Sequence, residues 1–119
     1  MSFLDDNLAA LAGRMPGLAR ALAHARPAGS GGPEVSPSAA GPPTARWEGA
    51  WLHSRHDPRR EAAAQVERET DEQTSTALVL GFGLGYAAEA LLSLRPGASL
   101  LVIEPDPVIF LAALASRDL

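Results

Sequence analysis

Cysteine is absent from this 119-residue sequence, which excludes disulfides, zinc–thiolate sites and cysteine nucleophiles. The three histidines are too few and too scattered for a histidine metal cluster, so we expect no metal site. The sequence has no block of basic residues and its net charge is −4, so we expect no nucleic-acid partner bound through a basic surface.

Signals for export and for membrane insertion are also missing. The N-terminal residues MSFLDDNL are acidic and lack the basic-then-apolar order of a secretion signal. The longest apolar stretch, residues 77–94, is broken by glycines and by Glu89, so it is not a membrane span. We therefore expect a cytoplasmic protein without a membrane partner.

Residues 1–26 carry an apolar stripe typical of an amphipathic helix. Its apolar side chains recur at intervals of three and four positions: Leu4, Leu8, Leu11, Met15, Leu18 and Leu22. Ser2 and Asp5 fit a capping box at its start. Pro16 predicts either a kink or two short helices, the second beginning near that proline. We expect this segment to pack on the main domain or to mediate self-association.

Residues 27–50 are rich in proline and glycine, a composition typical of a linker or an irregular loop. The alternation in PEVSPSA leaves a short edge strand as the other interpretation. The composition alone does not choose between a linker and short strands.

Residues 51–119 have the pattern of the start of an α/β domain. A short extended segment, Trp51–Ser54, precedes a helix from Pro58 to about Thr70, and a polar loop follows. The remaining elements have the order β-α-β-α, which implies a parallel pair of buried strands with a right-handed crossover. They are the strand TALVLG, the helix Tyr86–Leu94, the strand SLLVIE and a helix from Pro107 to about Arg117. Two such strands cannot bury both faces and both edges, so we expect a longer chain or a partner to complete the sheet.

Three glycines at alternating positions follow the first of these strands, in LVLGFGLGY. Gly81, Gly83 and Gly85 permit a tight turn and let a ligand approach the backbone. Glu104 ends the next strand 23 residues after Gly81, near the distance at which an acidic residue accepts ribose hydroxyls in nucleotide-binding sheets. The G-x-G-x-G spacing is closer to the first motif of S-adenosylmethionine methyltransferases than to G-x-G-x-x-G. The alternative is that the glycines serve only tight strand–helix packing.

Other polar residues are weaker candidates. His53 and His56 flank Ser54, but no oxyanion-hole motif accompanies them, and Asp57 is expected to cap a helix. We interpret His53 as a packing or substrate-contact residue rather than a catalytic base. Asp106 is expected to cap a helix first and to contact a ligand second.

Four segments in order resemble the motility accessory factor (Maf) family, which shares a domain with archaeal 6-hydroxymethylpterin diphosphokinase MptE-like proteins. They are NLAALAGRMPGLARAL, WLHSRHDPRREA, LVLGFGLGYAAEALL and LLVIEPDPVIFLAAL. The most specific parts are LHS-x-x-DP-x-x-EA and GFGLGY, and the resemblance covers residues 7–119. It implies a Rossmann-like domain, a longer chain, and short strands in the Pro/Gly-rich region.

The resemblance also implies an activity. Bacterial members are similar to sialyltransferase-like enzymes and are thought to move nonulosonic acids from a CMP carrier to serine or threonine of flagellin. The nucleotide would then lie against Gly81, Gly83 and Gly85, with Glu104 near its ribose. The other residues expected on that side are Tyr86, Asp106, His53, Ser54 and Asp57. The catalytic base and most of the acceptor site would lie beyond Leu119, so no catalytic residue is assigned.

Three alternatives stay open. Archaeal relatives transfer diphosphate from ATP to a pterin, which would require magnesium. A methyltransferase would bind S-adenosylmethionine, although no acidic residue stands just before Gly81. The third is a scaffold segment that binds no small molecule.

Overall fold

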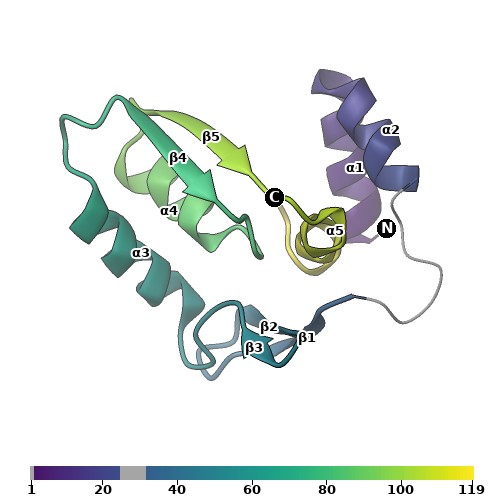
Figure 1. Cartoon of the computed structure of the whole chain (residues 1–119), viewed down its shortest axis with the longest axis horizontal. Coiled ribbons are helices and arrows are strands. Elements are labelled where there is room, and N and C mark those ends of the chain that lie inside the picture. The colour runs from purple at the N-terminus through teal and green to yellow at the C-terminus, as the bar shows by residue number, and fades with distance from the viewer. Residues whose placement is uncertain (1, 25–31) are drawn as a thin grey trace.

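The computed structural model describes residues 2–24 and 32–119, which form an α/β fold with two separate sheets (Figure 1). The second sheet pairs β4 (Thr76–Leu80) with β5 (Ser99–Ile103) in parallel, with Leu78 opposite Leu101. Helix α4 (Tyr86–Leu94) connects these strands, and α5 (Pro107–Ser116) follows β5. The predicted β-α-β-α order and the partial Rossmann-like fold are confirmed.

Helix boundaries follow the local signals in the sequence. Helix α3 (Pro58–Glu69) begins with Asp57, whose side chain accepts a hydrogen bond from the amide of Arg60. Helix α5 begins in the same way, with Asp106 accepting from the amide of Val108. Each aspartate is followed by a proline at the first helical position, where a missing N–H costs nothing.

The N-terminal segment forms two helices rather than one kinked helix. Helix α1 (Phe3–Arg14) is capped by Ser2, and α2 (Pro16–His24) begins at the proline. Both helices lie beside α5 (Figure 1), where their leucines surround a small apolar cluster. The cluster consists of Leu22, Leu111 and Leu114, with Leu4, Leu8, Leu11 and Phe110 packed against it. The segment therefore packs on the main α/β unit, one of its two expected locations.

The Pro/Gly-rich region contains short strands, as the family resemblance implied. Strands β1 (Glu34–Pro37), β2 (Pro43–Trp47) and β3 (Ala50–Trp51) form an antiparallel sheet. The part of the predicted linker at residues 27–31 lies outside the described residues. Ala45 of β2 is fully buried in a core cluster with residues of α3, α4 and α5, so this small sheet is packed against the α/β unit.

Only one face of the parallel sheet is covered within the described residues. Helices α3 and α4 cover that face, where Val66 of α3 and Leu91 of α4 pack with Val79 of β4. The opposite face carries large apolar side chains that are about half exposed or more: Leu78, Leu80, Leu101 and Ile103. The continuous apolar runs of the two strands thus place one set of alternate residues in the core and the other set on an uncovered face. This agrees with the expectation that two strands alone cannot bury both faces of the sheet.

None of the helices formed by the described residues combines the length and the apolarity that crossing a membrane requires.

Candidate functional site

A pocket of about 460 Å³ lies at the carboxyl ends of β4 and β5, where the glycine turn leads into α4. Ligand sites in open parallel sheets occur at this edge. The lining comes from the two strand ends and the residues that follow them, from the segment after β3 and from α5: Leu52, His53, Leu80, Gly81, Gly83, Ile103, Glu104, Pro105 and Ile109. The structure thus brings together four of the predicted site residues, namely His53, Gly81, Gly83 and Glu104.

Glu104 is bonded to the glycine turn itself. Its Oε1 accepts hydrogen bonds from the amides of Phe82, at 3.0 Å, and Gly83, at 3.3 Å. Its Oε2 accepts one from the amide of Asp106, at 3.1 Å. One carboxylate therefore links the end of β5 to the turn after β4, and charge-assisted bonds of this kind are among the stronger ones in proteins.

His53 holds the next residue of the turn. Its Nε2 accepts a hydrogen bond from the amide of Leu84 at 2.8 Å, which places the ring proton on Nδ1. Burial lowers the pKa of His53, and the nearby charge of Arg117 lowers it further, while Glu61 opposes them. The neutral imidazole is therefore favoured, and its basic nitrogen is occupied by the turn. In this arrangement His53 positions the turn and is not a free general base.

Tyr86 packs against the ring of His53, and Arg117 packs against the ring of Tyr86. Tyr86 is 1% exposed, its ring meets that of His53 edge-on at 5.0 Å, and its hydroxyl donates to the carbonyl of Pro43. The guanidinium of Arg117 lies 3.9 Å from the centre of the Tyr86 ring and donates to the Leu84 carbonyl and to Glu89. Burial raises the pKa of Tyr86, against the charge of Arg117. Tyr86 was predicted to contact the nucleotide; its side chain is buried and is not among those that line the pocket, so this contact stays a prediction.

The remaining predicted site residues have capping functions at the edge of the site. The hydroxyl of Ser54 accepts from the amides of His56 and Asp57, and Asp57 in turn caps α3. Asp106 caps α5. The structure does not place their side chains in the pocket lining, so their contact with a ligand stays a prediction.

The three glycines are required for different reasons. All three have positive φ, with values of 84° for Gly81, 57° for Gly83 and 90° for Gly85. A Cβ on Gly83 would lie 2.5 Å from Nε2 of His53, and a Cβ on Gly85 would lie 2.7 Å from Cζ of Phe82. A Cβ on Gly81 would meet no atom within 4 Å. Gly83 and Gly85 thus allow close internal packing, while Gly81 leaves open space at the pocket.

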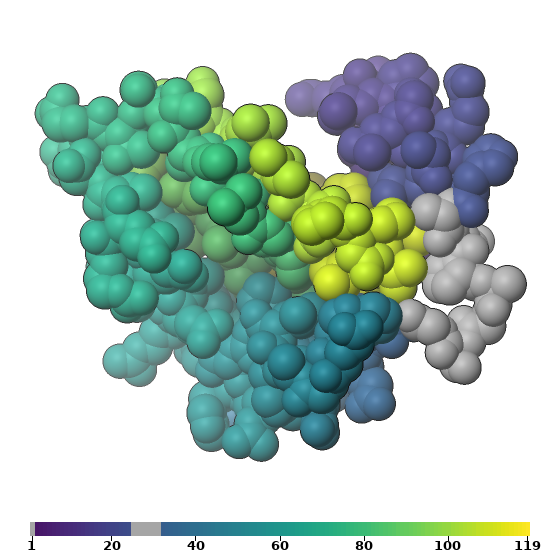
Figure 2. Space-filling view, in the orientation of Figure 1, coloured from purple at the N-terminus to yellow at the C-terminus, as the bar shows by residue number. Residues whose placement is uncertain are grey.

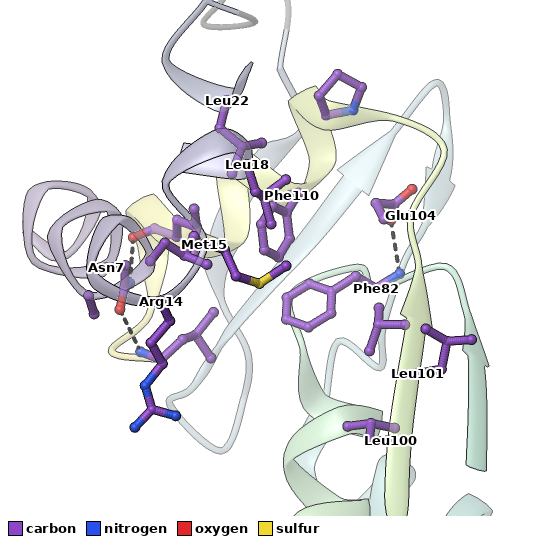
Figure 3. Close-up of a pocket in the computed structure, with 16 residues that line it drawn as sticks. Asn7, Arg14, Met15, Leu18, Leu22, Phe82, Leu100, Leu101, Glu104 and Phe110 are labelled. Carbon is purple, nitrogen blue, oxygen red and sulfur yellow. Dashed lines mark hydrogen bonds between the residues drawn. The ribbon is translucent and has the colours of Figure 1, made fainter. Parts of the chain in front are cut away.

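A larger hollow of about 850 Å³ lies between the helices α1 and α2 and strand β5 (Figures 2 and 3). Figure 3 shows Met15, Leu18, Phe110 and Leu101 around it, so its walls are mainly apolar. Glu104 lines both hollows. We regard the smaller pocket as the candidate site because polar groups converge there on a glycine turn.

Sequence reasoning missed two buried polar residues that hold this region together. Asn7 is 6% exposed and donates to the carbonyls of Leu114 and Arg117, while its Oδ1 accepts from the amide of Leu119. Figure 3 shows Asn7 at the edge of the larger hollow. A polar side chain next to the apolar stripe of α1 was the available signal. Arg117 gave no such signal, because an arginine at a helix end is usually a solvated residue.

Residues 2–24 and 32–119 contain no group of three histidine, aspartate or glutamate side chains that could hold a metal ion.

Comparison with known proteins gives a sequence relative and a structural neighbour. No family model matches the sequence. A protein of Treponema pallidum (strain Nichols), described as uncharacterized, is 37% identical over 124 residues that cover 98% of this chain and 42% of the relative. A solved Maf glycosyltransferase from Magnetospirillum magneticum AMB-1 aligns with a TM-score of 0.68 and 16% identity, covering 98% of this chain and 24% of that one. This chain shares its fold with part of that structure.

The two comparisons limit which properties of the relative and of the neighbour can be transferred to this chain. At 16% identity the structural likeness concerns the fold, and the chain spans less than half the length of its sequence relative. The partial Rossmann-like fold expected from the sequence agrees with the fold of this neighbour. The reaction and the substrates belong to the proposal that follows.

Proposed function

We propose that this chain provides the nucleotide-binding part of a Maf-type glycosyltransferase, which moves a CMP-activated nonulosonic sugar to serine or threonine of flagellin. The observation that carries the proposal is the pocket at the carboxyl ends of β4 and β5, formed by a glycine turn and Glu104. The likeness to a glycosyltransferase over 98% of the chain adds support.

The pocket suits one end of a nucleotide in size and chemistry. Its volume of about 460 Å³ lies within the range of small-molecule sites. Gly81 presents bare backbone to it, and Glu104 presents a carboxylate. The basic nitrogen of His53 is bonded to the turn, and the carboxylate of Glu104 accepts three backbone amides. Catalysis would therefore depend on residues other than these, as the family resemblance implied.

Calorimetric titration of CMP into the wild-type chain and two glycine variants tests the proposal. Gly81→Ala places a methyl group at the open edge of the pocket and should weaken CMP binding at least tenfold. Gly49→Ala is the matched control, because Gly49 has a φ of 83°, has open space around it and lies in the β2–β3 turn. Equal CMP affinity of all three proteins, or no CMP binding by the wild type, would contradict the proposal.

The same titration with ATP–magnesium and with S-adenosylmethionine compares the rival functions. Binding of ATP only with magnesium would favour diphosphate transfer to a pterin. Binding of S-adenosylmethionine would favour a methyltransferase. Failure of all three ligands would favour a scaffold segment.

A further inference from the structure

A cationic and aromatic cluster lies on the outer face of the small sheet. Arg46 of β2 stands opposite Trp51 of β3, so their side chains share one face. The guanidinium carbon of Arg46 lies 6.0 Å from the centre of the Trp51 ring, and that of Arg55 lies 5.4 Å from it. Leu52 lines the candidate pocket, whereas Trp51 is 42% exposed. Because neighbouring residues of an extended segment point to opposite sides, this cluster is separate from the pocket.

Neither arginine of this cluster has a carboxylate partner among the described residues. The ion pairs formed by residues 2–24 and 32–119 join Glu89 to Arg59 and to Arg117. Glu34 stands opposite Arg46 on β1, yet it forms no ion pair with that arginine. Both cations lie within 6.0 Å of one ring, inside the Debye length of about 8 Å at physiological ionic strength, so their positive potentials add. An anion at this face would therefore meet two guanidiniums that no described carboxylate engages.

The residue types of the cluster favour carboxylates that a protein presents. A guanidinium binds a carboxylate through two parallel hydrogen bonds. Arginine and tryptophan are enriched at protein interfaces and are frequent among the residues that carry most of the binding energy. The net charge of −4 disfavours a nucleic acid, because the rest of the chain would repel its phosphates.

The open edge of β3 favours a partner segment with an extended backbone. Strand β3 is an outer strand of its sheet. The amide of Leu52 donates to the carbonyl of Ala45, so in the alternating antiparallel pattern the N–H and C=O of Trp51 point away from β2. An extended peptide can pair with such an edge while its side chains contact the adjacent face.

We propose that Arg46, Trp51 and Arg55 form a docking surface for an extended acidic segment of a partner protein. Carboxylates of that segment bind the two guanidiniums, and an apolar side chain between them packs on the exposed part of the indole. This surface lies outside the candidate pocket, so its test does not depend on the proposed function.

Fluorescence polarization with a labelled peptide of the repeat Glu-Ser-Val-Ser tests the proposal. In an extended chain this repeat places glutamate and valine alternately on one face. The comparison probes are the same peptide with glutamine in place of every glutamate, and an oligothymidylate of similar length. We expect the glutamate peptide to bind roughly tenfold more tightly than the glutamine peptide, with an affinity that falls as salt rises. Equal binding of the two peptides, no binding of the glutamate peptide, or tighter binding of the oligothymidylate would overturn the proposal.

Single substitutions test whether the peptide binds at this face. Arg46→Gln, Arg55→Gln and Trp51→Ala should each weaken binding of the glutamate peptide roughly fivefold. Arg68→Gln is the matched control, because Arg68 is also exposed and forms no ion pair with another described residue. Wild-type affinity in all three cluster variants, or the same loss in Arg68→Gln, would contradict the proposal.

The wild-type chain provides a measurement that needs no variant. The glutamate peptide should shift the indole N–H signal of Trp51 in an NMR titration, and the glutamine peptide should shift it less. An indole signal of Trp51 that stays in place at saturating glutamate peptide would overturn the proposal.

Discussion

Alanine at Gly83 should destabilise the fold far more than alanine at Gly81, although both glycines belong to one motif. Both have positive φ, so alanine at either costs about 1–2 kcal/mol in backbone conformation. At Gly81 that is the whole cost, because the new methyl group meets no atom within 4 Å.

At Gly83 the new methyl group also displaces His53. The Cβ would lie 2.5 Å from Nε2, about 1 Å inside ordinary contact distance. Moving the ring breaks the bond from the buried amide of Leu84, and a lost partner of this kind costs roughly 1–3 kcal/mol. The total for Gly83→Ala is then roughly 2–5 kcal/mol.

Urea unfolding of Gly81→Ala, Gly83→Ala and the control Gly49→Ala measures these costs. Gly49 has a φ of 83° and open surroundings, so Gly49→Ala should match Gly81→Ala. Equal destabilisation by Gly81→Ala and Gly83→Ala would refute the proposed contact between His53 and the turn. It follows that a large substitution at Gly83 cannot by itself separate ligand binding from folding, whereas Gly81→Ala can.

Three further predictions concern the groups around the turn. Asn7→Ala removes three hydrogen bonds at the end of α5 and should cost about 3 kcal/mol in urea unfolding; a change below about 1 kcal/mol would contradict it. Because the pKa of His53 is lowered by burial, the unfolded chain takes up this proton first as pH falls. Stability should therefore fall as the pH drops below about 6.5, and His53→Gln should remove that part of the pH dependence. Arg117→Met should cost about 2 kcal/mol through the lost bonds to Glu89 and to the turn, measured by thermal unfolding; an unchanged midpoint would contradict it.

Local signals predicted most of the helices and both parallel strands. Asp57 and Asp106 each precede a proline, and in each case the helix begins where that pair predicts. The helix break at Pro16 is local in the same sense, because proline cannot donate the hydrogen bond that a continuous helix needs.

The sequence pattern did not predict the contacts between residues that lie far apart in the sequence. Leu84 and His53 are 31 positions apart, and Phe82 and Glu104 are 22 apart, so no spacing rule relates their hydrogen bonds. The short strands were ambiguous because Pro37 and Pro43 resemble linker residues. In the structure they lie opposite each other where β1 ends and β2 begins, a location that proline tolerates in a sheet.

The most direct test of the proposed function is an amide NMR titration of this chain with CMP, followed by ATP–magnesium and S-adenosylmethionine in separate samples. We predict that CMP shifts the signals of residues 81–86 and that the other two ligands leave them in place. Absence of a CMP response, or a response of these amides to one of the other ligands alone, would contradict the assignment of this pocket to a CMP-dependent glycosyltransferase.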